Sequence, residues 1–439
     1  MSYNMNDIIY KKREGYELTK EEINFFIDGY TKGDIPDYQA SALLMAIYFR
    51  GLNKAETFDL TNAMRYSGDT VDLSKIKGIK VDKHSSGGVG DKTTLVVAPI
   101  AASCGIPIAK MSGRGLGFTG GTVDKMESIP GFKTALEPDE FMKQVNDIGI
   151  SVIGQTAHIA PADKKLYALR DVTSTVDNFG LISSSIMSKK LAAGSDAIVL
   201  DVKCGDGAFM ESLHDATTLA NLMVEIGNSA GKKTVAVITD MNQPLGKAVG
   251  NSLEVIEAIE TLKGNGPEDF YELCKRIAGV MLFVGEKAKT VDEGYLMAED
   301  AIKSGRALNK FREFVIHQGG NPVIIDRYMT FPQAKRKEEI LAESSGFIKE
   351  IKARTIGIAS QKTGAGRETK EDEIDLSAGI LLNKKVGDKV EKGEVLCTLY
   401  GNDIAKVLMG KEIAKGAFVI SDKEVMRPNV IKRIIGIEG

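Results

Sequence analysis

Residues 81–94, VDKHSSGGVGDKTT, and residues 110–122, KMSGRGLGFTGGT, share one design. In each segment a short strand-like run leads into a loop of glycine and hydroxyl residues, and a helical pattern follows. Such a loop points backbone N–H groups and the positive end of a helix dipole at an anion, and glycine lets the backbone approach closely. Two such loops in succession predict that one tetrahedral oxyanion, inorganic phosphate, is held from both sides. The side chains expected to add donors are those of Lys83, Ser85, Thr94, Ser112 and Thr122.

Glycine-rich turns also join strands to helices without any ligand, and a single loop of this kind is more often structural than functional. Two in succession, each with lysine and hydroxyl residues, favour a binding site. Neither loop has the GxxxxGK[ST] spacing of a P-loop, and the segment 88–90 lacks the third glycine of the dinucleotide fingerprint. The pattern therefore disfavours a nucleotide triphosphatase and a Rossmann dehydrogenase.

The composition indicates a soluble protein of two or three domains. The chain has 439 residues, of which 43% are hydrophobic, and a formal net charge of −3. Without a basic excess we expect neither nucleic acid nor an anionic membrane as a partner. The start lacks the pattern of a signal peptide, and the apolar segment 95–109 is too short for a membrane span. We expect a cytoplasmic location, because the four cysteines are far apart and lack metal-like spacing.

The first part of the expected α/β fold is a small helical domain. Residues 1–67 have helical patterns throughout, with a capping box at Thr19 and Glu22 and a second helix that Asp37 is expected to cap. The segment 163–194 is also helical and interrupts the later rhythm of strands and helices. We expect it to pack on the N-terminal helices, which makes the small domain discontinuous.

The second part is a large mixed or parallel α/β domain. From residue 78 onward, strand patterns alternate with helical ones, as in a largely parallel sheet covered by helices, where ligands bind at the carboxyl ends of strands. Residues 78–160 and 195–335 form this phosphate-binding domain. The expected strands are 79–81, 107–111, 151–153, 197–202 and 234–239.

The third part, residues 336–439, is a C-terminal α+β module rich in strands. Its segments 346–351 and 386–396 have the pattern of β-hairpins with glycine turns. The second is similar to the barrel-sandwich hairpins of lipoyl and biotinyl domains. Because no exposed hairpin of the Met-Lys-Met kind follows, a structural module is favoured over a carrier arm.

Two groups of side chains could carry chemistry. His84 lies inside the first loop beside Lys83, where it could bond a substrate oxygen or deliver a proton to a leaving group. Ser185 and Lys189 are four residues apart on a predicted helix, so they share a face that Arg170 could reach from the preceding helix. These donors and acceptors suit a planar ring with oxo substituents, although a solvated basic face explains the spacing equally well.

Four motifs identify the family that the chain resembles. They are KHSSGGVGD at 83–91, KMSGRGLG at 110–117, TGGTVDK at 119–125 and SIMSKK at 185–190. Together they are similar to the motifs of the thymidine and pyrimidine-nucleoside phosphorylases, and the resemblance covers nearly the whole chain. It implies reversible cleavage of uridine, thymidine or deoxyuridine by inorganic phosphate, giving the free base and a (deoxy)ribose 1-phosphate.

The resemblance also implies roles for individual residues. Phosphate would be bound by Lys83, Ser85, Thr94, Lys110, Met111, Ser112 and Thr122. The pyrimidine would be bound by Arg170, Ser185 and Lys189, and His84 would meet the base O2 and assist its departure. Phosphate would attack C1′ with inversion, and no organic cofactor would be needed. A homodimer through the helical domain and a hinge between the domains are implied as well.

A monovalent cation such as K⁺ is implied near the phosphate loop. The matching positions are Gly90, Lys92, Leu245, Ala248 and Glu257. Relatives carry threonine where this chain has Lys92, whose ammonium could lie where the ion would be. Relatives also tend to have a small residue in place of Asp206.

Two other functions remain open on the sequence. A phosphoribosyltransferase of the anthranilate type resembles this family in fold and also places a glycine loop after a strand. It would need a diphosphate sugar and magnesium, so activity with phosphate in the presence of a chelator separates the two. A carrier or binding module is the remaining alternative, prompted by the C-terminal hairpins.

Overall fold

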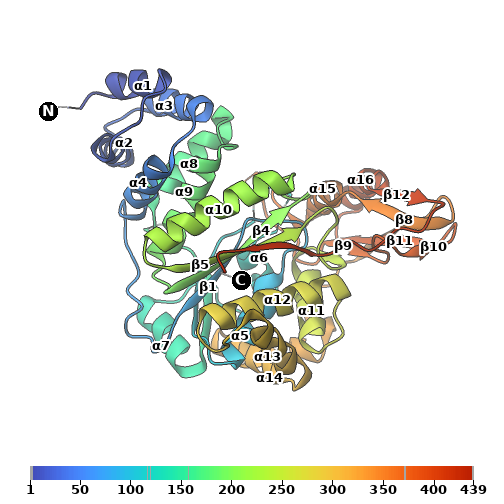
Figure 1. Cartoon of the computed structure of the whole chain (residues 1–439). Helices are drawn as coiled ribbons and strands as arrows, with labels where there is room; N and C mark the ends of the chain where they lie inside the picture. The colour runs from blue at the N-terminus through green and yellow to red at the C-terminus, as the bar shows by residue number, and fades with distance from the viewer. Residues whose placement is uncertain (1–2, 116, 119, 157, 370–371, 438–439) are drawn as a thin grey trace.

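The computed structural model describes residues 3–115, 117–118, 120–156, 158–369 and 372–437. Leu116 and Thr119 of the second glycine loop lie outside the described residues. The chain forms a helical domain, a central sheet covered by helices, and a strand-rich C-terminal part on the other side of the sheet (Figure 1). This arrangement confirms the predicted fold class. Among the described residues, no helix combines the length and the apolar character that crossing a membrane requires.

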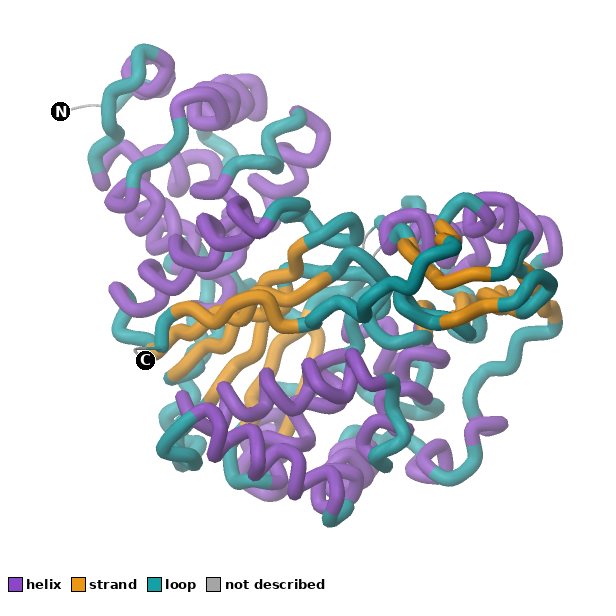
Figure 2. The backbone as a smooth tube through the Cα atoms, turned by 45° about the vertical axis from the view of Figure 1, so that its right-hand side comes forward, coloured by secondary structure: helices purple, strands orange, loops and turns teal. Residues whose placement is uncertain are grey.

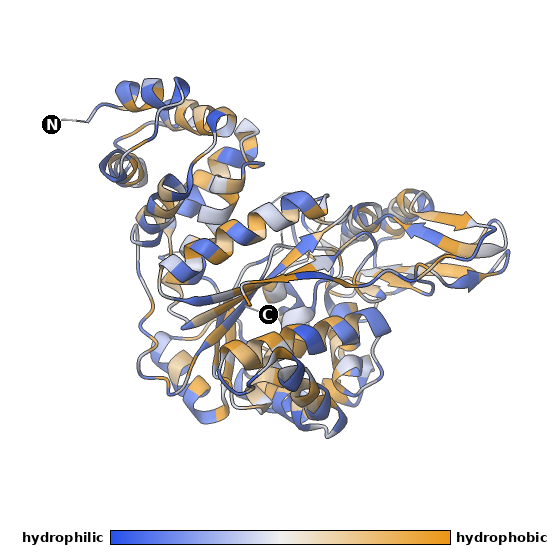
Figure 3. Ribbon diagram, in the orientation of Figure 1, coloured by the Kyte–Doolittle hydropathy of each residue, from blue (hydrophilic) through white to orange (hydrophobic). Residues whose placement is uncertain are grey.

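The helical domain is discontinuous, as predicted. Its helices are α1 (Met5–Arg13), α2 (Lys20–Lys32), α3 (Asp37–Arg50), α4 (Lys54–Arg65), α8 (Pro161–Thr173) and α9 (Phe179–Ala192). Polar and apolar residues alternate along them (Figure 3), and the apolar ones form one core that includes residues of α8 and α9. The capping box of Thr19 and Glu22 is present. The expected cap at Asp37 is wrong, because Pro36 occupies the cap position and Asp37 is already the first helical residue.

The central sheet has the strand order β1-β4-β5-β13, and the pair β2-β3 lies beside β1. Its strands are β1 (Val81–Ser85), β2 (Ile108–Ser112), β3 (Ile150–Gly154), β4 (Ala197–Cys204), β5 (Lys233–Asp240) and β13 (Ile431–Ile435). All pairings are parallel except that of β13. The expected strand at 79–81 starts two residues later, because the Lys80 N–H donates to the Asp196 side chain instead of to a neighbouring strand.

Helices cover both faces of the sheet (Figure 2). Helices α9 and α10 (Leu213–Ser229) pack on the face that carries Ile198, Leu200 and Val202 of β4. The opposite face packs on α5 (Thr93–Ser103) and α12 (Glu268–Val284), which are covered in turn by α11 (Asn251–Leu262), α13 (Val291–Lys303) and α14 (Arg306–His317). The remaining helices of this domain are α6 (Thr122–Glu127), α7 (Pro138–Ile148), η1 (Pro322–Ile325) and η2 (Tyr328–Thr330).

The C-terminal part contains two small sheets, β10-β8-β12 and β6-β9-β11-β7. Its elements are β7 (Arg336–Leu341), β8 (Gly346–Ile351), α15 (Ala353–Ser360), η3 (Gln361–Ala365), β9 (Gly379–Leu382), β10 (Lys389–Val390), β11 (Val395–Gly401), α16 (Ile404–Lys415) and β12 (Phe418–Ser421). The two expected hairpins are wrong, because each glycine turn passes the chain from one sheet to the other. In such a sandwich the inner faces of the two sheets pack against each other.

Several contacts join this C-terminal part to the large domain, and three of them correct or extend the sequence predictions. Strand β6 (Ala248–Val249) of the large domain pairs with β9, and β13, which was expected within the module 336–439, pairs with β5. The carboxylate of Asp206 accepts the Arg354 N–H at 2.8 Å, in the first turn of α15. The side chain at position 206 thus has a structural partner in the C-terminal part.

Candidate active site

The two glycine loops lie next to each other at the carboxyl ends of β1 and β2, the edge at which parallel sheets bind ligands. Ser85 ends β1 and Ser112 ends β2. Thr94 lies in the first turn of α5, and Thr122 begins α6. The four predicted hydroxyl residues therefore gather where the two loops open.

A buried lysine fastens the two loops to each other. The Lys125 ammonium donates to the carbonyls of Asp91 at 2.7 Å and Gly120 at 3.1 Å, one in each loop. It also pairs with the Glu254 carboxylate of α11 at 2.9 Å. Gly121 must be glycine, since a Cβ there would overlap the backbone nitrogen of Gly115. Lys125 thus sets the spacing between the two loops.

Buried charges of alternating sign lie beneath the first loop. The Lys83 ammonium lies 3.3 Å from Asp201 and 3.9 Å from Asp91, and Lys203 pairs with Asp201 at 2.7 Å. Burial alone would raise the pKa of Asp91, but the ammonium groups of Lys83, Lys203 and Lys125 outweigh it and hold that pKa well below its usual range. Lys83 therefore lies at the base of the first loop, beside an Asp91 carboxylate that stays ionised.

A second buried cluster joins the large domain to the helical domain. Asp82 on β1 accepts from Lys110 on β2 at 3.2 Å and from Lys190 on α9 at 2.9 Å. Burial would raise the pKa of Asp82, but the two lysines lower it to about 2. Burial lowers the pKa of Lys110 to about 8, although Asp82 acts to raise it. This contact brings the Ser185–Lys190 face of α9 up to the glycine loops.

Two predicted phosphate residues have other partners. The Lys110 ammonium also donates to the Lys83 carbonyl, so its donors support β1 rather than point into the loop. The side chain of Met111 packs with apolar residues, while its carbonyl accepts from Lys190 at 3.4 Å. Both positions shape the site through the backbone of β1 and β2.

His84 is partly buried at the mouth of the first loop, on the same side of β1 as Asp82. Burial, followed by the positive charges of Lys190 and Lys110, holds the pKa of His84 well below its usual range. The ring is therefore neutral at pH 7. A neutral imidazole can donate one N–H hydrogen bond to a substrate oxygen, and this favours hydrogen bonding over delivery of a proton from an imidazolium.

The three predicted pyrimidine residues lie in α8 and α9. Lys189 donates to the Ser185 hydroxyl at 3.1 Å and pairs closely with Asp163 of α8, so these two side chains share a face as the spacing indicated. The Arg170 guanidinium is buried and donates to the carbonyls of Thr175, Leu181 and Val176 at 3.2, 3.1 and 2.7 Å. Arg170 thus holds the turn between the two helices, and these contacts among the described residues use three of its five N–H groups.

The five residues implied for a monovalent cation also come together. The Lys92 ammonium donates to the carbonyls of Leu245 at 2.7 Å and Ala248 at 3.0 Å and pairs closely with Glu257. A Cβ on Gly90 would lie 2.7 Å from the Leu245 oxygen. The oxygen atoms suit a cation, but the lysine ammonium already lies among them.

The sequence reasoning gave no role to Asp82, Lys190, Asp201 or Lys203. One signal was available, since Asp201 and Lys203 are two charged residues inside an otherwise apolar strand, and both are fully buried. Charged side chains in such a position need partners, so they mark a polar site on that face of the strand.

The chain matches three family models. The a/b domain of the glycosyl transferase family matches residues 77–308, and the helical bundle domain of that family matches residues 6–68. The pyrimidine nucleoside phosphorylase C-terminal domain matches residues 347–420. Because the a/b-domain model covers more than half of the chain, the chain belongs to the glycosyl transferase family.

Curated relatives narrow this class. A pyrimidine-nucleoside phosphorylase of Geobacillus stearothermophilus is 60% identical over 398 residues, which cover 91% of this chain and 92% of the relative. One of Staphylococcus aureus strain MSSA476 is 56% identical over 436 residues, 98% of this chain and 99% of the relative. The chain belongs to the pyrimidine-nucleoside phosphorylase family.

A solved structure has the same fold. The crystal structure of anthranilate phosphoribosyltransferase from Thermus thermophilus matches with a TM-score of 0.59 and 19% identity. The match covers 71% of this chain and 99% of that one. At this identity the likeness concerns the fold alone.

Proposed function

We infer that the chain catalyses the reversible phosphorolysis of pyrimidine nucleosides, giving the free base and a pentose 1-phosphate. The observation that carries this conclusion is the pair of glycine loops, fastened by Lys125 and opposed by the Ser185–Lys190 face of α9. Phosphate and a flat oxo-substituted ring would then be bound on facing surfaces of two domains. The matches to the family models and relatives support the same reaction.

The reaction needs two kinds of assistance from these residues. A phosphate oxygen forms a bond to C1′ on one face, while the bond from C1′ to the ring nitrogen breaks on the other, which inverts C1′. The loop amides and Lys83 position the phosphate as nucleophile. The electron pair of the broken bond goes to the base, whose oxygens would accept hydrogen bonds from Lys189, Arg170 and the neutral His84 ring. Stabilising that charge is the main catalytic term.

The direct test is to incubate the protein with uridine and inorganic phosphate, with and without a chelator, and to measure uracil by chromatography. Uracil release that needs phosphate and resists the chelator supports phosphorolysis. A requirement for a diphosphate sugar and magnesium would instead support the phosphoribosyltransferase, which the shared fold makes the second candidate. No release under conditions in which a known phosphorylase is active would contradict the assignment.

His84→Ala separates catalysis from binding. If the ring donates to the departing base, this change should lower kcat by roughly 10²- to 10³-fold while leaving the KM for phosphate little changed. An unaltered kcat would remove the role of His84.

We also propose a homodimer formed through the helical domain. Tyr10 on α1 and both Tyr38 and Phe49 on α3 are 57%, 74% and 76% exposed, on helices at the outer end of the molecule (Figure 1). Tyr38 and Phe49 are about three helical turns apart and so point the same way. Phe49→Asp should convert the dimer to a monomer in sedimentation velocity, whereas Met329→Asp, an equally exposed position outside this domain, should not.

A cytoplasmic location stays a prediction, which the four free thiols support.

A further inference from the structure

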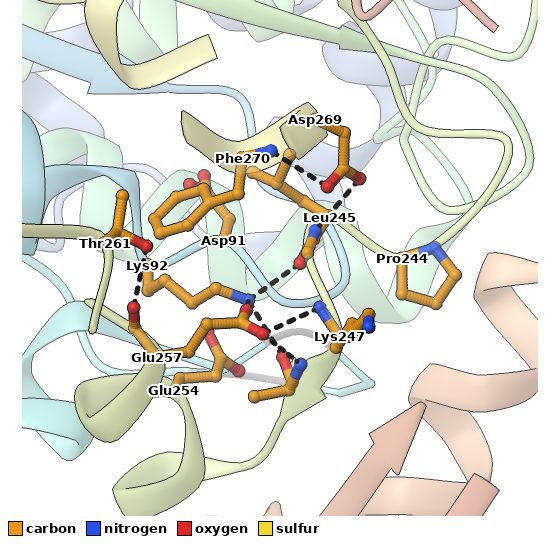
Figure 4. A network of polar contacts seen from close by, with 12 residues as sticks. Asp91, Lys92, Pro244, Leu245, Lys247, Glu254, Glu257, Thr261, Asp269 and Phe270 are labelled. Carbon is orange, nitrogen blue, oxygen red and sulfur yellow. Dashed lines mark hydrogen bonds and ion pairs between the residues drawn. The ribbon is translucent and has the colours of Figure 1, made fainter. Parts of the chain in front are cut away.

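Lys92 is a fully buried lysine at the end of the first glycine loop. It directly precedes α5, and its residue is only 1% exposed. The side chain runs away from the phosphate loop into the segment 244–249, where the ammonium lies among the residues drawn in Figure 4. Burial of a charge at this depth is unfavourable unless every donor has a partner.

The surroundings supply the ammonium group with two hydrogen-bond acceptors and a counter-charge. Two N–H groups donate to the Leu245 and Ala248 carbonyls, and the nitrogen forms an ion pair with one carboxylate oxygen of Glu257. The other oxygen of Glu257 accepts the N–H groups of Lys247 and Ala248 at 2.9 and 3.1 Å. The ring of Phe270 closes the remaining side, 5.0 Å from the Lys92 nitrogen.

The same set of oxygens could hold a monovalent cation, but it does not fit one here. Backbone carbonyls and a carboxylate are ligands that replace the hydration shell of K⁺. An ion at this place would have to share those oxygens with the Lys92 ammonium, and two positive charges so close repel strongly in a buried site. A Cβ on Gly246 would lie 3.0 Å from the ammonium, so the loop is already packed around it.

We propose that Lys92 replaces a monovalent cation with a covalently attached one, so that this chain needs no K⁺ for the order of its phosphate loop. Two links carry the effect. Asp91, the neighbour of Lys92, contacts Lys83 and Lys125 in the candidate phosphate site. On the far side, the segment held by Lys92 leads into β6, which pairs with β9 of the C-terminal part. Lys92 is thus a positioning residue that connects these two regions.

The test is thermal unfolding of the wild type and of Lys92→Thr, in potassium chloride and in tetramethylammonium chloride at equal ionic strength. We expect the wild-type Tm to be the same in both salts. Lys92→Thr should have a Tm several degrees lower in tetramethylammonium, because Glu257 and two carbonyls lose their partner, and K⁺ should restore much of the loss in a saturable manner. Lys12→Thr is the matched control, since it removes a buried lysine that pairs with the Glu56 carboxylate at 2.7 Å in the helical domain. Its loss should be independent of K⁺.

Two results would overturn the proposal. One is a saturable rise of the wild-type Tm with K⁺, which would mean that an ion binds beside Lys92. The other is a folded Lys92→Thr variant whose Tm is the same in both salts. If Lys92→Thr does not fold, two measurements on the wild type decide. One is its Tm in the two salts. The other is a thallium(I) soak of wild-type crystals, which should give no anomalous peak between the Leu245 and Ala248 oxygens.

The effect of Lys92 on the enzymatic reaction rests on the proposed function, whereas the effects on Tm and on thallium binding do not. The proposal about Lys92 and the proposed function can therefore fail separately. In tetramethylammonium, Lys92→Thr should raise the KM for phosphate about tenfold more than the KM for uridine, and K⁺ should reverse this change. Equal changes in both KM values would contradict the link to the phosphate loop.

Discussion

Replacing Asp82 with asparagine removes the negative charge shared by Lys110 and Lys190, and with it the ionic contact between β1 and α9. Because the neighbouring lysines lower the pKa of Asp82 to about 2, its ionisation contributes roughly 2–3 kcal/mol to stability at neutral pH. The pKa is lowered in the folded state. The contribution is therefore complete above about pH 4 and is lost as the pH falls through about 2.

The substitution should cost more than this, because it leaves two buried ammonium groups without their carboxylate. Breaking a buried ion pair in this way costs about 3–5 kcal/mol, which in a domain of this size lowers Tm on the order of 10 °C. The pKa of Lys110, already lowered to about 8 by burial, should fall further once Asp82 no longer acts to raise it.

Differential scanning fluorimetry at pH 7 measures this change, and Asp196→Asn is the matched control. Asp196 pairs with Lys80 at 2.7 Å just before the same strand, but its side chain is 39% exposed. A pair open to solvent contributes about 1 kcal/mol or less, so this control should change Tm by no more than a few degrees. A Tm for Asp82→Asn within about 2 °C of the control would refute the reasoning.

Three further predictions concern the ring, the second loop and the C-terminal contact. The ring of His84 should stay neutral at pH 7 in a proton NMR titration, and Lys190→Met should raise the His84 pKa by removing a positive charge; an unchanged pKa would contradict the assigned cause. Gly121→Ala should displace the second loop from the Gly115 nitrogen and raise the KM for phosphate about 100-fold in steady-state kinetics, while a KM within twofold of wild type would show the loop to be pliable. Asp206→Ala should destabilise the contact with α15 by about 1 kcal/mol, seen as faster limited proteolysis of the C-terminal part, and equal rates would exclude this role.

Local patterns were enough to predict the fold class. The two glycine loops and the individual helices and strands depend on spacing within a few residues, which a sequence displays directly. The capping box at Thr19 and Glu22 was predictable for the same reason, because its two residues are three positions apart. The hairpins at 346–351 and 386–396 were mispredicted because a glycine turn does not reveal which sheet each strand joins.

The partners of the buried charges were not predictable in this way. Lys83 and Lys110 were both expected to bind phosphate, and Lys92 was expected at the cation site, but the spacing of these residues did not give their partners. In the folded chain, Lys92 turns toward Leu245 and Glu257, and Lys110 turns toward β1.

The sequence by itself therefore determined where the two glycine loops would lie, because glycine, hydroxyl and helix-start signals are local. Only the tertiary structure decided which carboxylates and carbonyls the nearby lysines contact within the protein. Asp82 and Lys190 are 108 positions apart, and the strength of a buried pair depends on distances and burial that exist only after folding.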